Sequence, residues 1–356
     1  MTDGTAGQSR ETRARETQAR ETQARETWWT PGAMARRKAR LEARGRMLTA
    51  VRLFFAGRAF AEVETPALQA SPGMEVHLRA FRTELREPFE KQGRPMFLHT
   101  SPEFAMKKLL AGGMDRIFQM ARVYRNEERS ALHHPEFTML EWYRAGATLS
   151  DLMDDCEALL KACAAAAGTR TFLWQGVTCD PYAPWRRLSV AEAFREYADM
   201  DVLALTGDKA GFRRAAKQVG ITAGDKDDWD DIFFRVFLER IEPNLGVSAP
   251  TILYGYPASM AALARLDADD PRVAERFELY VAGMELANAF GELTDAAEQR
   301  RRFDADNRKR EKLYDERYPV DEDFIAALEH GLPASAGIAL GFDRLVMLAT
   351  GAETIE

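Results

Sequence analysis

The sequence of 356 residues is poor in cysteine and has no long apolar run. Its three cysteines, Cys156, Cys163 and Cys179, match no metal-ligand spacing and are too few for a disulfide framework, as is typical of proteins in a reducing compartment. The chain has no stretch of about 18 apolar residues, and its N-terminus lacks the apolar core of a signal peptide. We therefore expect a cytoplasmic protein that does not span a membrane.

Two common nucleotide-binding motifs are missing as well. The sequence has neither the G-x-G-x-x-G fingerprint of dinucleotide-binding folds nor the G-x-x-x-x-G-K-[ST] motif of P-loop proteins. The formal net charge of −7 argues against a broad nucleic-acid-binding surface and leaves room only for a local basic patch.

The N-terminal segment has almost no apolar residues before its two tryptophans. Residues 10–29 read RETRA, RETQA, RETQA and RETWW. A period of five places each repeat on a new face of a 3.6-residue helix, so no apolar stripe forms. We predict a low-complexity, solvated tail over residues 1–33 and one folded domain over residues 34–356. The arginines between Arg36 and Arg46 are either a solvated helix face or a docking patch for an acidic partner.

The apolar periodicity predicts an α+β domain in which antiparallel strands carry helices on one side. Strands are expected at 60–66, 116–128, 136–146, 251–257, 277–290 and 337–341. Helices are expected at 35–57, 150–165, 189–200, from 295 onward, and at 342–351. Capping patterns begin two of these helices, at Ser189-x-x-Glu192 and Asp295-x-x-Glu298, and Gly351 closes the last one.

The hairpin of 116–128 and 136–146 is the first place where chemistry is expected. Side chains alternate along a strand, so Phe137, Met139, Glu141 and Tyr143 share one face. Together with Arg125, such a surface suits a nucleoside triphosphate, because a ring can stack on a base and an arginine can bind phosphate oxygens. The alternative is an edge hairpin with surface ion pairs.

Acidic residues near the C-terminus suggest a metal. Glu285 and Glu292 could share Mg²⁺, which prefers oxygen ligands and bridges phosphates, or they could be two surface acids. Their opposite strand parity requires a bulge, which Gly291 could supply. In "TSPEF" Glu103 could bind a substrate amine. Arg344 needs a partner, either Asp343 or a triphosphate.

Three segments together resemble a known family. "EVETPAL" (62–68), "YRNEE…HHPEFTMLEWY" (124–143) and "GIALGFDRL" (337–345) resemble the three signature motifs of class II aminoacyl-tRNA synthetases. "HPEFTMLEWY" and "GMELANAFGELTDAAEQRRRF" are most similar to the lysyl branch, and the resemblance runs from residue 28 to residue 356. A lysyl-tRNA synthetase has an anticodon-binding domain before the first motif, whereas only a short tail precedes it here. The chain therefore resembles the stand-alone paralogues that attach a β-lysyl group to elongation factor P.

The resemblance implies a class II synthetase catalytic fold, an antiparallel sheet flanked by helices, in a homodimer that uses ATP and Mg²⁺. It implies (R)-β-lysine or lysine as the amino acid, elongation factor P as the acceptor, and no tRNA. Residues expected to line the amino-acid site are Ser101, Pro102, Glu103, Tyr143, Glu292 and Ala339. Residues expected to contact ATP are Arg125, Asn126, Glu127, His133, His134, Phe137, Glu285, Leu286, Gly341 and Arg344. The resemblance assigns Mg²⁺ to Glu285 and Glu292, and catalysis to Arg125, Glu285, Glu292 and Arg344.

Three residues depart from the lysyl pattern. His134 stands where the family has asparagine, and Ala289 replaces a glycine, which we expect to narrow the pocket floor. Ala339 also replaces a glycine, and its methyl group is expected to favour a substrate whose amine is displaced by one carbon. Two alternative functions remain at this point: a lysine-tRNA ligase without an anticodon domain, and a non-catalytic amino-acid-binding paralogue.

Overall fold

The computed structural model describes residues 29–356, so most of the predicted N-terminal tail lies outside the described residues. The chain divides into a part that ends at Gly45 and a part that runs from Arg46 to Glu356, and each is described by itself. Helix α2 (Pro31–Ala56) begins in the first part, close to the predicted helix 35–57. There Lys38 and Glu42 form an ion pair of 3.9 Å one turn apart. The docking role of the arginines in this helix stays a prediction.

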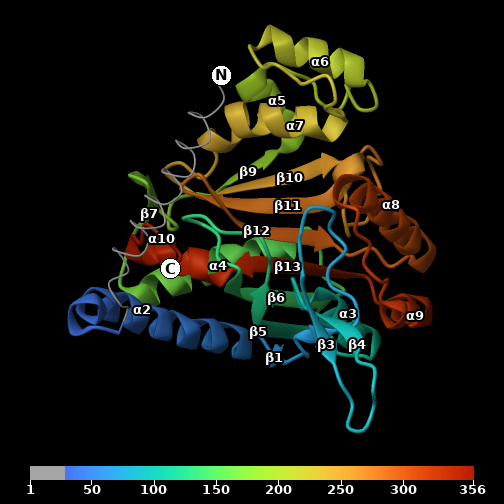
Figure 1. The fold of residues 1–356 in the computed structure, drawn as a ribbon. Coiled ribbons are helices and arrows are strands. Elements are labelled where there is room, and N and C mark those ends of the chain that lie inside the picture. Colours follow the sequence, from blue (N-terminus) through green and yellow to red (C-terminus); the bar gives the residue numbers. More distant parts are fainter. Residues whose placement is uncertain (1–28) are drawn as a thin grey trace, which may run out of the picture. The chain divides into compact units, whose positions relative to one another are not determined.

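The second part is built on an eight-stranded sheet with the order β1-β5-β6-β13-β12-β11-β10-β9 (Figure 1). Its strands are β1 (Ala61–Glu62), β5 (Arg116–Tyr124), β6 (Glu136–Ala145), β9 (Arg186–Ser189), β10 (Thr251–Pro257), β11 (Val273–Val281), β12 (Met284–Gly291) and β13 (Ser335–Gly341). Only the two outermost pairs, β1 with β5 and β9 with β10, are parallel. The predicted α+β class with an antiparallel sheet is confirmed.

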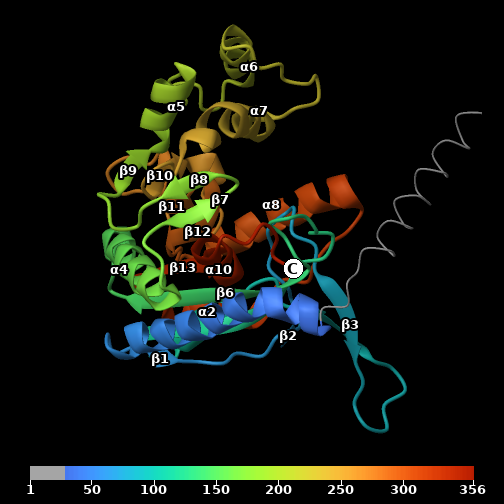
Figure 2. The ribbon, with the colours of Figure 1, turned by 90° about the vertical axis from the view of Figure 1, so that its left-hand side faces the viewer.

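Helices and smaller strands surround this sheet. The helices after α2 are α3 (Glu103–Ala111), α4 (Leu149–Ala167), α5 (Val190–Ala198), α6 (Lys209–Gln218), α7 (Trp229–Val236), α8 (Ala296–Tyr314), α9 (Glu322–Gly331) and α10 (Phe342–Thr350). A π-helical turn, η1 (Phe237–Ile241), and two short 3₁₀ turns, η2 (Glu242–Asn244) and η3 (Ala258–Met260), complete the helical segments. Two small sheets contain β2 (Leu68–Gln69), β3 (Phe81–Leu85) and β4 (Arg94–Leu98), and β7 (Phe172–Trp174) with β8 (Val177–Cys179). Helices α4 and α8 lie on opposite sides of the large sheet, so the prediction that helices cover only one side is wrong (Figure 2).

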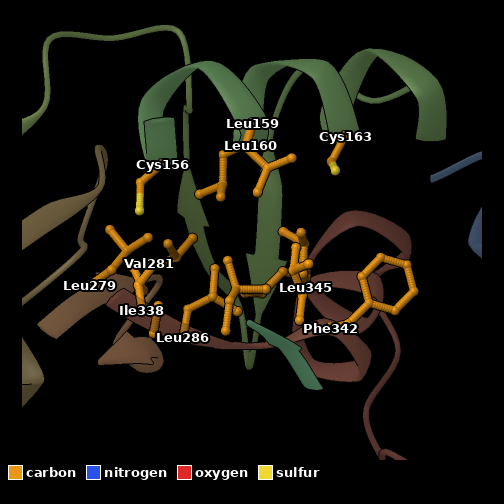
Figure 3. Close-up of a cluster of buried hydrophobic side chains, with 14 of the residues drawn as sticks. Cys156, Leu159, Leu160, Cys163, Leu279, Val281, Leu286, Ile338, Phe342 and Leu345 are labelled. Atoms are coloured by element: carbon orange, nitrogen blue, oxygen red, sulfur yellow. The ribbon is translucent and has the colours of Figure 1, made fainter. Parts of the chain in front are cut away.

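Helices α4 and α10 bury one face of the sheet. Cys156, Leu159, Leu160 and Cys163 project from α4 toward strand residues such as Ile338 (Figure 3). All four α4 side chains are fully buried, and burial of this much apolar surface is the main favourable term in folding. The three cysteines of the chain are free and buried, so they serve as small apolar residues of the core.

The predicted helix caps are present. The Ser189 hydroxyl accepts a hydrogen bond from the Glu192 amide, and the Glu192 carboxylate accepts one from Ser189 in return. Asp295 accepts from the Glu298 amide at the start of α8, and Gly351 ends α10 in the left-handed conformation, with φ 62°. These local signals could be predicted because each depends on a few neighbouring residues.

Two strand predictions need correction. The segment 60–66 forms only the two-residue strand β1, and β2 follows in a different sheet. The segment 277–290 is a hairpin, because Ala282 and Gly283 have φ of 53° and 76° and reverse the chain between β11 and β12. Positive φ at both central residues is the requirement of a tight two-residue turn.

A bulge in this hairpin decides where its acidic residues point. Leu279 pairs with Ala287 and Tyr280 pairs with Glu285, which leaves Leu286 as an extra residue. An extra residue reverses the alternation of side chains on one side of the bulge. Glu285 therefore shares a face with Asn288 and Glu292. The irregularity predicted at Gly291 lies instead at Leu286.

Candidate active site

The sheet face opposite α4 and α10 forms the floor of a cavity of about 590 Å³. Strands β6, β11, β12 and β13 and the loops around them contribute the lining side chains. Those with polar or charged groups include Glu75, Ser101, Glu103, Arg125, Glu128, His133, His134, Arg276, Glu278, Glu285, Asn288, Asp343 and Arg344. Such a mixture of basic and acidic groups in one concave region is typical of a site for a polar ligand.

Beside one end of the cavity lie three buried acids, Glu103 of α3, Glu141 of β6 and Glu292 after β12, which we call the acidic pocket. The Ser101 hydroxyl donates to Glu141 Oε1 at 2.6 Å, and the Tyr143 hydroxyl donates to Glu141 Oε2 at 2.8 Å. Glu141 is fully buried, and burial together with the neighbouring Glu103 carboxylate raises its pKa to about 8. The sequence pattern placed Glu141 on this face but did not assign it to the amino-acid site.

Lys107 joins the two other acids of this pocket. Its ammonium lies 2.5 Å from Glu103 Oε1 and 2.5 Å from Glu292 Oε2, and the ammonium is wholly buried. Burial raises the pKa of Glu292 to about 7, against the opposing attraction of Lys107. Neither Glu292 oxygen has a further hydrogen-bond partner among the described residues. Glu292 therefore has unused hydrogen-bonding capacity, but it is fully buried. Of the three acids only Glu103 lines the cavity, and Tyr143 and Glu292 lie behind it.

Gly337 on β13 makes room for this arrangement. A Cβ atom at Gly337 would lie 2.2 Å from Tyr143 Cε1 and 2.3 Å from Glu292 Oε1. Both distances are far inside van der Waals contact, so any larger residue would push these side chains aside. The first glycine of "GIALGFDRL" is thus required by packing in the acidic pocket.

Arg344, on the first turn of α10, lies at the other end of the cavity. It donates to the Glu285 carbonyl oxygen at 2.8 Å and to His133 Nε2 at 2.8 Å. Arginine has no acceptor, so His133 Nε2 must accept and its Nδ1–H must donate to the Ser130 hydroxyl at 2.8 Å. Burial and the adjacent Arg344 charge lower the pKa of His133, which favours this neutral tautomer. Asp343 instead accepts from the Thr138 amide.

The hairpin β5–β6 contributes an arginine and a ring. The Arg125 guanidinium lies 5.3 Å from the centre of the Phe137 ring, and both residues line the cavity. Asn126 and Glu127 follow in a turn, where Glu127 has φ 66° and is exposed. Neither belongs to the residues that line the cavity, and the Glu127 carboxylate points to Arg79 at 3.9 Å.

The carboxylates that face each other near the arginines are Glu278 and Glu285. Both line the cavity from paired strands, and burial together with the Glu278 charge raises the pKa of Glu285 to about 7. Glu292 lies seven residues further along an extended chain, roughly 20 Å away. At that separation, a single Mg²⁺ with bonds of about 2.1 Å is held more easily by Glu285 and Glu278. The assignment of Mg²⁺ to both Glu285 and Glu292 stays a prediction.

Several residues of the site were missed in the sequence. Arg276 donates to Glu278 Oε1 at 2.7 Å and to Asn288 Oδ1 at 3.2 Å, and Glu278 also accepts from the Tyr256 and Tyr280 hydroxyls. Strand alternation places residues 276, 278 and 280 on one face, so recognition of the β11–β12 turn would have revealed them. Lys107 carried no signal, because Glu103 and Lys107 read as an ordinary helix-surface pair.

The remaining predicted residues lie as follows. Ala339 lines the cavity between Asn288 and Glu141 on the neighbouring strands, while Leu286 and Gly341 line the cavity near Arg344. Pro102 is buried at the start of α3. His134 lies at the rim, with Nδ1 2.6 Å from the Glu136 carbonyl oxygen.

Ala289 does not belong to the pocket floor. It is fully buried in the apolar cluster on the opposite sheet face. The expectation that it narrows the pocket is therefore wrong, because the Leu286 bulge leaves residue 289 on the core side.

Comparisons with known proteins identify a family and several relatives. Residues 20–356 match the family model described as tRNA synthetases class II (D, K and N). A relative from Pectobacterium carotovorum subsp. carotovorum, named elongation factor P–(R)-β-lysine ligase, is 43% identical over 332 residues, which are 93% of this chain and 96% of the relative. Relatives of the same name from Edwardsiella ictaluri and Proteus mirabilis are 42% and 41% identical, each over 92% of this chain and 95% of the relative. The chain belongs to the class II tRNA synthetase family of the D, K and N type.

Proposed function

We propose that this protein is an ATP-dependent ligase that activates (R)-β-lysine and transfers it to a lysine side chain of elongation factor P. One observation carries the proposal beyond the relatives' names. Ser101 and Glu103 line both the large cavity and a small hollow beside the acidic pocket. A cationic amino acid held by buried acids would therefore lie next to the arginines that suit phosphate groups.

The acidic pocket matches the charge of the amino acid. β-Lysine has two ammonium groups, and three buried acids lie close together beside the cavity: Glu103, which lines it, and Glu141 and Glu292 behind it. An ammonium that enters a buried carboxylate site gains a strong interaction, because water no longer competes for either group.

The reaction has two steps. The carboxylate oxygen of the amino acid attacks the α-phosphorus of ATP. The bond between the α-phosphorus and the oxygen that bridges to the β-phosphate breaks, and pyrophosphate leaves. The ε-amine of the acceptor lysine then attacks the carbonyl carbon of the adenylate, AMP leaves, and the amine loses a proton. Arg125 and Arg344 are fixed beforehand and stabilise the negative charge that develops on phosphate oxygens.

Magnesium fits the nucleotide end. Glu278 and Glu285 would hold the ion, which when bound neutralises phosphate charge. The described residues contain no group of three metal-ligating side chains, so phosphate oxygens and water would complete the coordination. Burial and the Glu278 carboxylate raise the pKa of Glu285, and a bound cation would oppose that increase.

The deciding experiment measures amino-acid-dependent exchange of pyrophosphate into ATP, followed by the mass of elongation factor P. We expect (R)-β-lysine to drive exchange better than lysine and the mass of the factor to increase by one β-lysyl group. Exchange without modification of the factor would point to a different acceptor, and lysyl-tRNA formation would favour the tRNA ligase. Absence of exchange with both amino acids would favour a non-catalytic paralogue.

The assembly and location of the protein are part of the proposal. We propose a cytoplasmic homodimer, because the family builds its dimer around the first motif. No helix among residues 29–356 is long and apolar enough to cross a membrane. Sedimentation of the full-length protein at micromolar concentration would test the dimer.

A further inference from the structure

The acidic pocket contains a lysine that the proposed reaction does not use. Lys107 belongs to α3, one turn after Glu103, and its side chain is fully buried. Such burial of an ammonium costs several kcal/mol unless it is paired. Its two close partners, Glu103 and Glu292, are themselves residues of the proposed amino-acid site.

We propose that Lys107 is a positioning and specificity residue, an internal counter-ion that holds Glu103 and Glu292 so that they bind the ammonium groups of the amino acid. The inference rests on the proposed function, since it deepens the description of the same site. An ammonium has three N–H donors, so one group can hold both acids at once.

Lys107 contacts only one oxygen of each carboxylate. It approaches Oε1 of Glu103 and Oε2 of Glu292 and leaves one oxygen of each carboxylate outside the ion pairs. The Oε1 atom of Glu292 is buried above Gly337 and has no hydrogen-bond partner among the described residues. The free oxygens are therefore held in place before the substrate enters, which reduces the entropy lost on binding.

The charge of the cluster also fits a diamino acid. One ammonium and two carboxylates carry a net charge of −1, which can attract an additional cation. Glu75, Glu141 and Tyr143 face the same cluster from neighbouring elements, and the charge of Arg265, which pairs with Glu275, also acts on Glu292. A substrate with one amine and an apolar side chain would leave this charge uncompensated, so the cluster selects against it.

The electrostatic effect has a definite sign. Burial raises the pKa of Glu292 to about 7, and the Lys107 charge opposes that increase. Removal of the charge would raise the carboxylate pKa further, so more Glu292 would be protonated at neutral pH. A protonated carboxyl is a poor partner for an ammonium group, so binding of the diamino acid would then require higher pH.

The test compares Lys107→Met with Lys108→Met. Lys108 is the next residue of α3 and pairs with Asp321 outside the pocket, so its variant makes the same chemical change without touching the site. Pyrophosphate exchange driven by (R)-β-lysine is measured from pH 6 to pH 9. We expect Lys107→Met to increase the KM for β-lysine at least about tenfold, to leave the KM for ATP within about twofold, and to move the acidic limb of kcat/KM to higher pH. Lys108→Met should behave as the wild type.

A second variant separates the effect of the lost charge from a failure to fold. Lys107→Gln keeps an N–H donor group and loses the charge, so it should show the same pH shift with a smaller change in KM. An unchanged KM and pH profile in a folded Lys107 variant would overturn the inference, as would failure of both Lys107 variants to fold while Lys108→Met folds, because Lys107 would then be structural. Absence of exchange in the wild type would instead defeat the proposed function. In that case a thermal shift by β-lysine, compared between wild type and Lys107→Gln, still tests Lys107.

Discussion

Ala339 is the residue at which the smallest change should alter substrate choice. It lies between Asn288 and Glu141 on the cavity floor, so its methyl group occupies space beside the acidic pocket. We expect Ala339→Gly to increase the ratio of kcat/KM for lysine to that for β-lysine, by about tenfold for the loss of one methyl contact. Pyrophosphate exchange with each amino acid measures the ratio. An unchanged ratio would assign Ala339 to packing alone.

Gly337, on the same strand, is a position where a larger side chain does not fit. Because an added Cβ would press on Tyr143 and Glu292, Gly337→Ala should destabilise the protein by about 1–3 kcal/mol and raise the KM for the amino acid more than that for ATP. Urea unfolding and pyrophosphate exchange check the two effects. Gly112→Ala is the control, since its added atom meets backbone oxygens only at 3.4 Å. Equal effects of both variants would contradict the packing argument.

At the scale of elements, the β11–β12 hairpin places its acidic residues in two different parts of the site. Its turn and the Leu286 bulge place Glu278 and Glu285 at the nucleotide end and direct Glu292 to the acidic pocket. Neither feature follows from the residue types alone. Strand parity without the bulge would have put Glu285 and Glu292 on opposite faces.

This separation predicts different defects for three conservative variants. We expect Glu278→Gln and Glu285→Gln to raise the Mg²⁺ concentration needed for half-maximal exchange about tenfold, because each removes half of the proposed carboxylate pair. Glu292→Gln should raise the KM for β-lysine instead and leave the Mg²⁺ requirement near that of the wild type. A strong Mg²⁺ effect in Glu292→Gln would instead support the pair of Glu285 and Glu292.

For the whole molecule, buried acids make stability depend on pH. The folded-state pKa of Glu141 is about 8, above its ordinary value of 4.5, and those of Glu285 and Glu292 are about 7. The folded state therefore binds more protons than the unfolded state in this range. The resulting stability is fully present below about pH 4.5 and is lost as pH rises through 7 to 8.

We accordingly expect the unfolding free energy of the ligand-free protein to fall by on the order of a few kcal/mol between pH 5 and pH 8. Urea unfolding at several pH values measures this slope, and β-lysine should reduce the fall by supplying cations to the acids. Glu141→Gln should make the slope shallower, because the glutamine side chain does not titrate. A slope of the same size in the variant would show that other groups cause the pH dependence.

Much of this protein could be predicted from its sequence, because the signals concerned are short-range. The α+β class, the hairpin of β5 and β6, the caps at Ser189 and Asp295, and the end of α10 depend on periodicity and on residues within one turn. The motifs around Arg125, Glu103 and Arg344 likewise identified both ends of the cavity.

Only the tertiary structure decided how these pieces meet. The bulge at Leu286 changed the faces of Glu285 and Ala289, the turn at Ala282 and Gly283 brought Glu278 to the site, and the packing of α3 against the sheet buried Lys107 between two acids. Each of these depends on strand register or on contact between residues far apart in the chain, which residue spacing does not encode. The sequence by itself determined the family and the chemical groups available, whereas register and packing determined which groups act together.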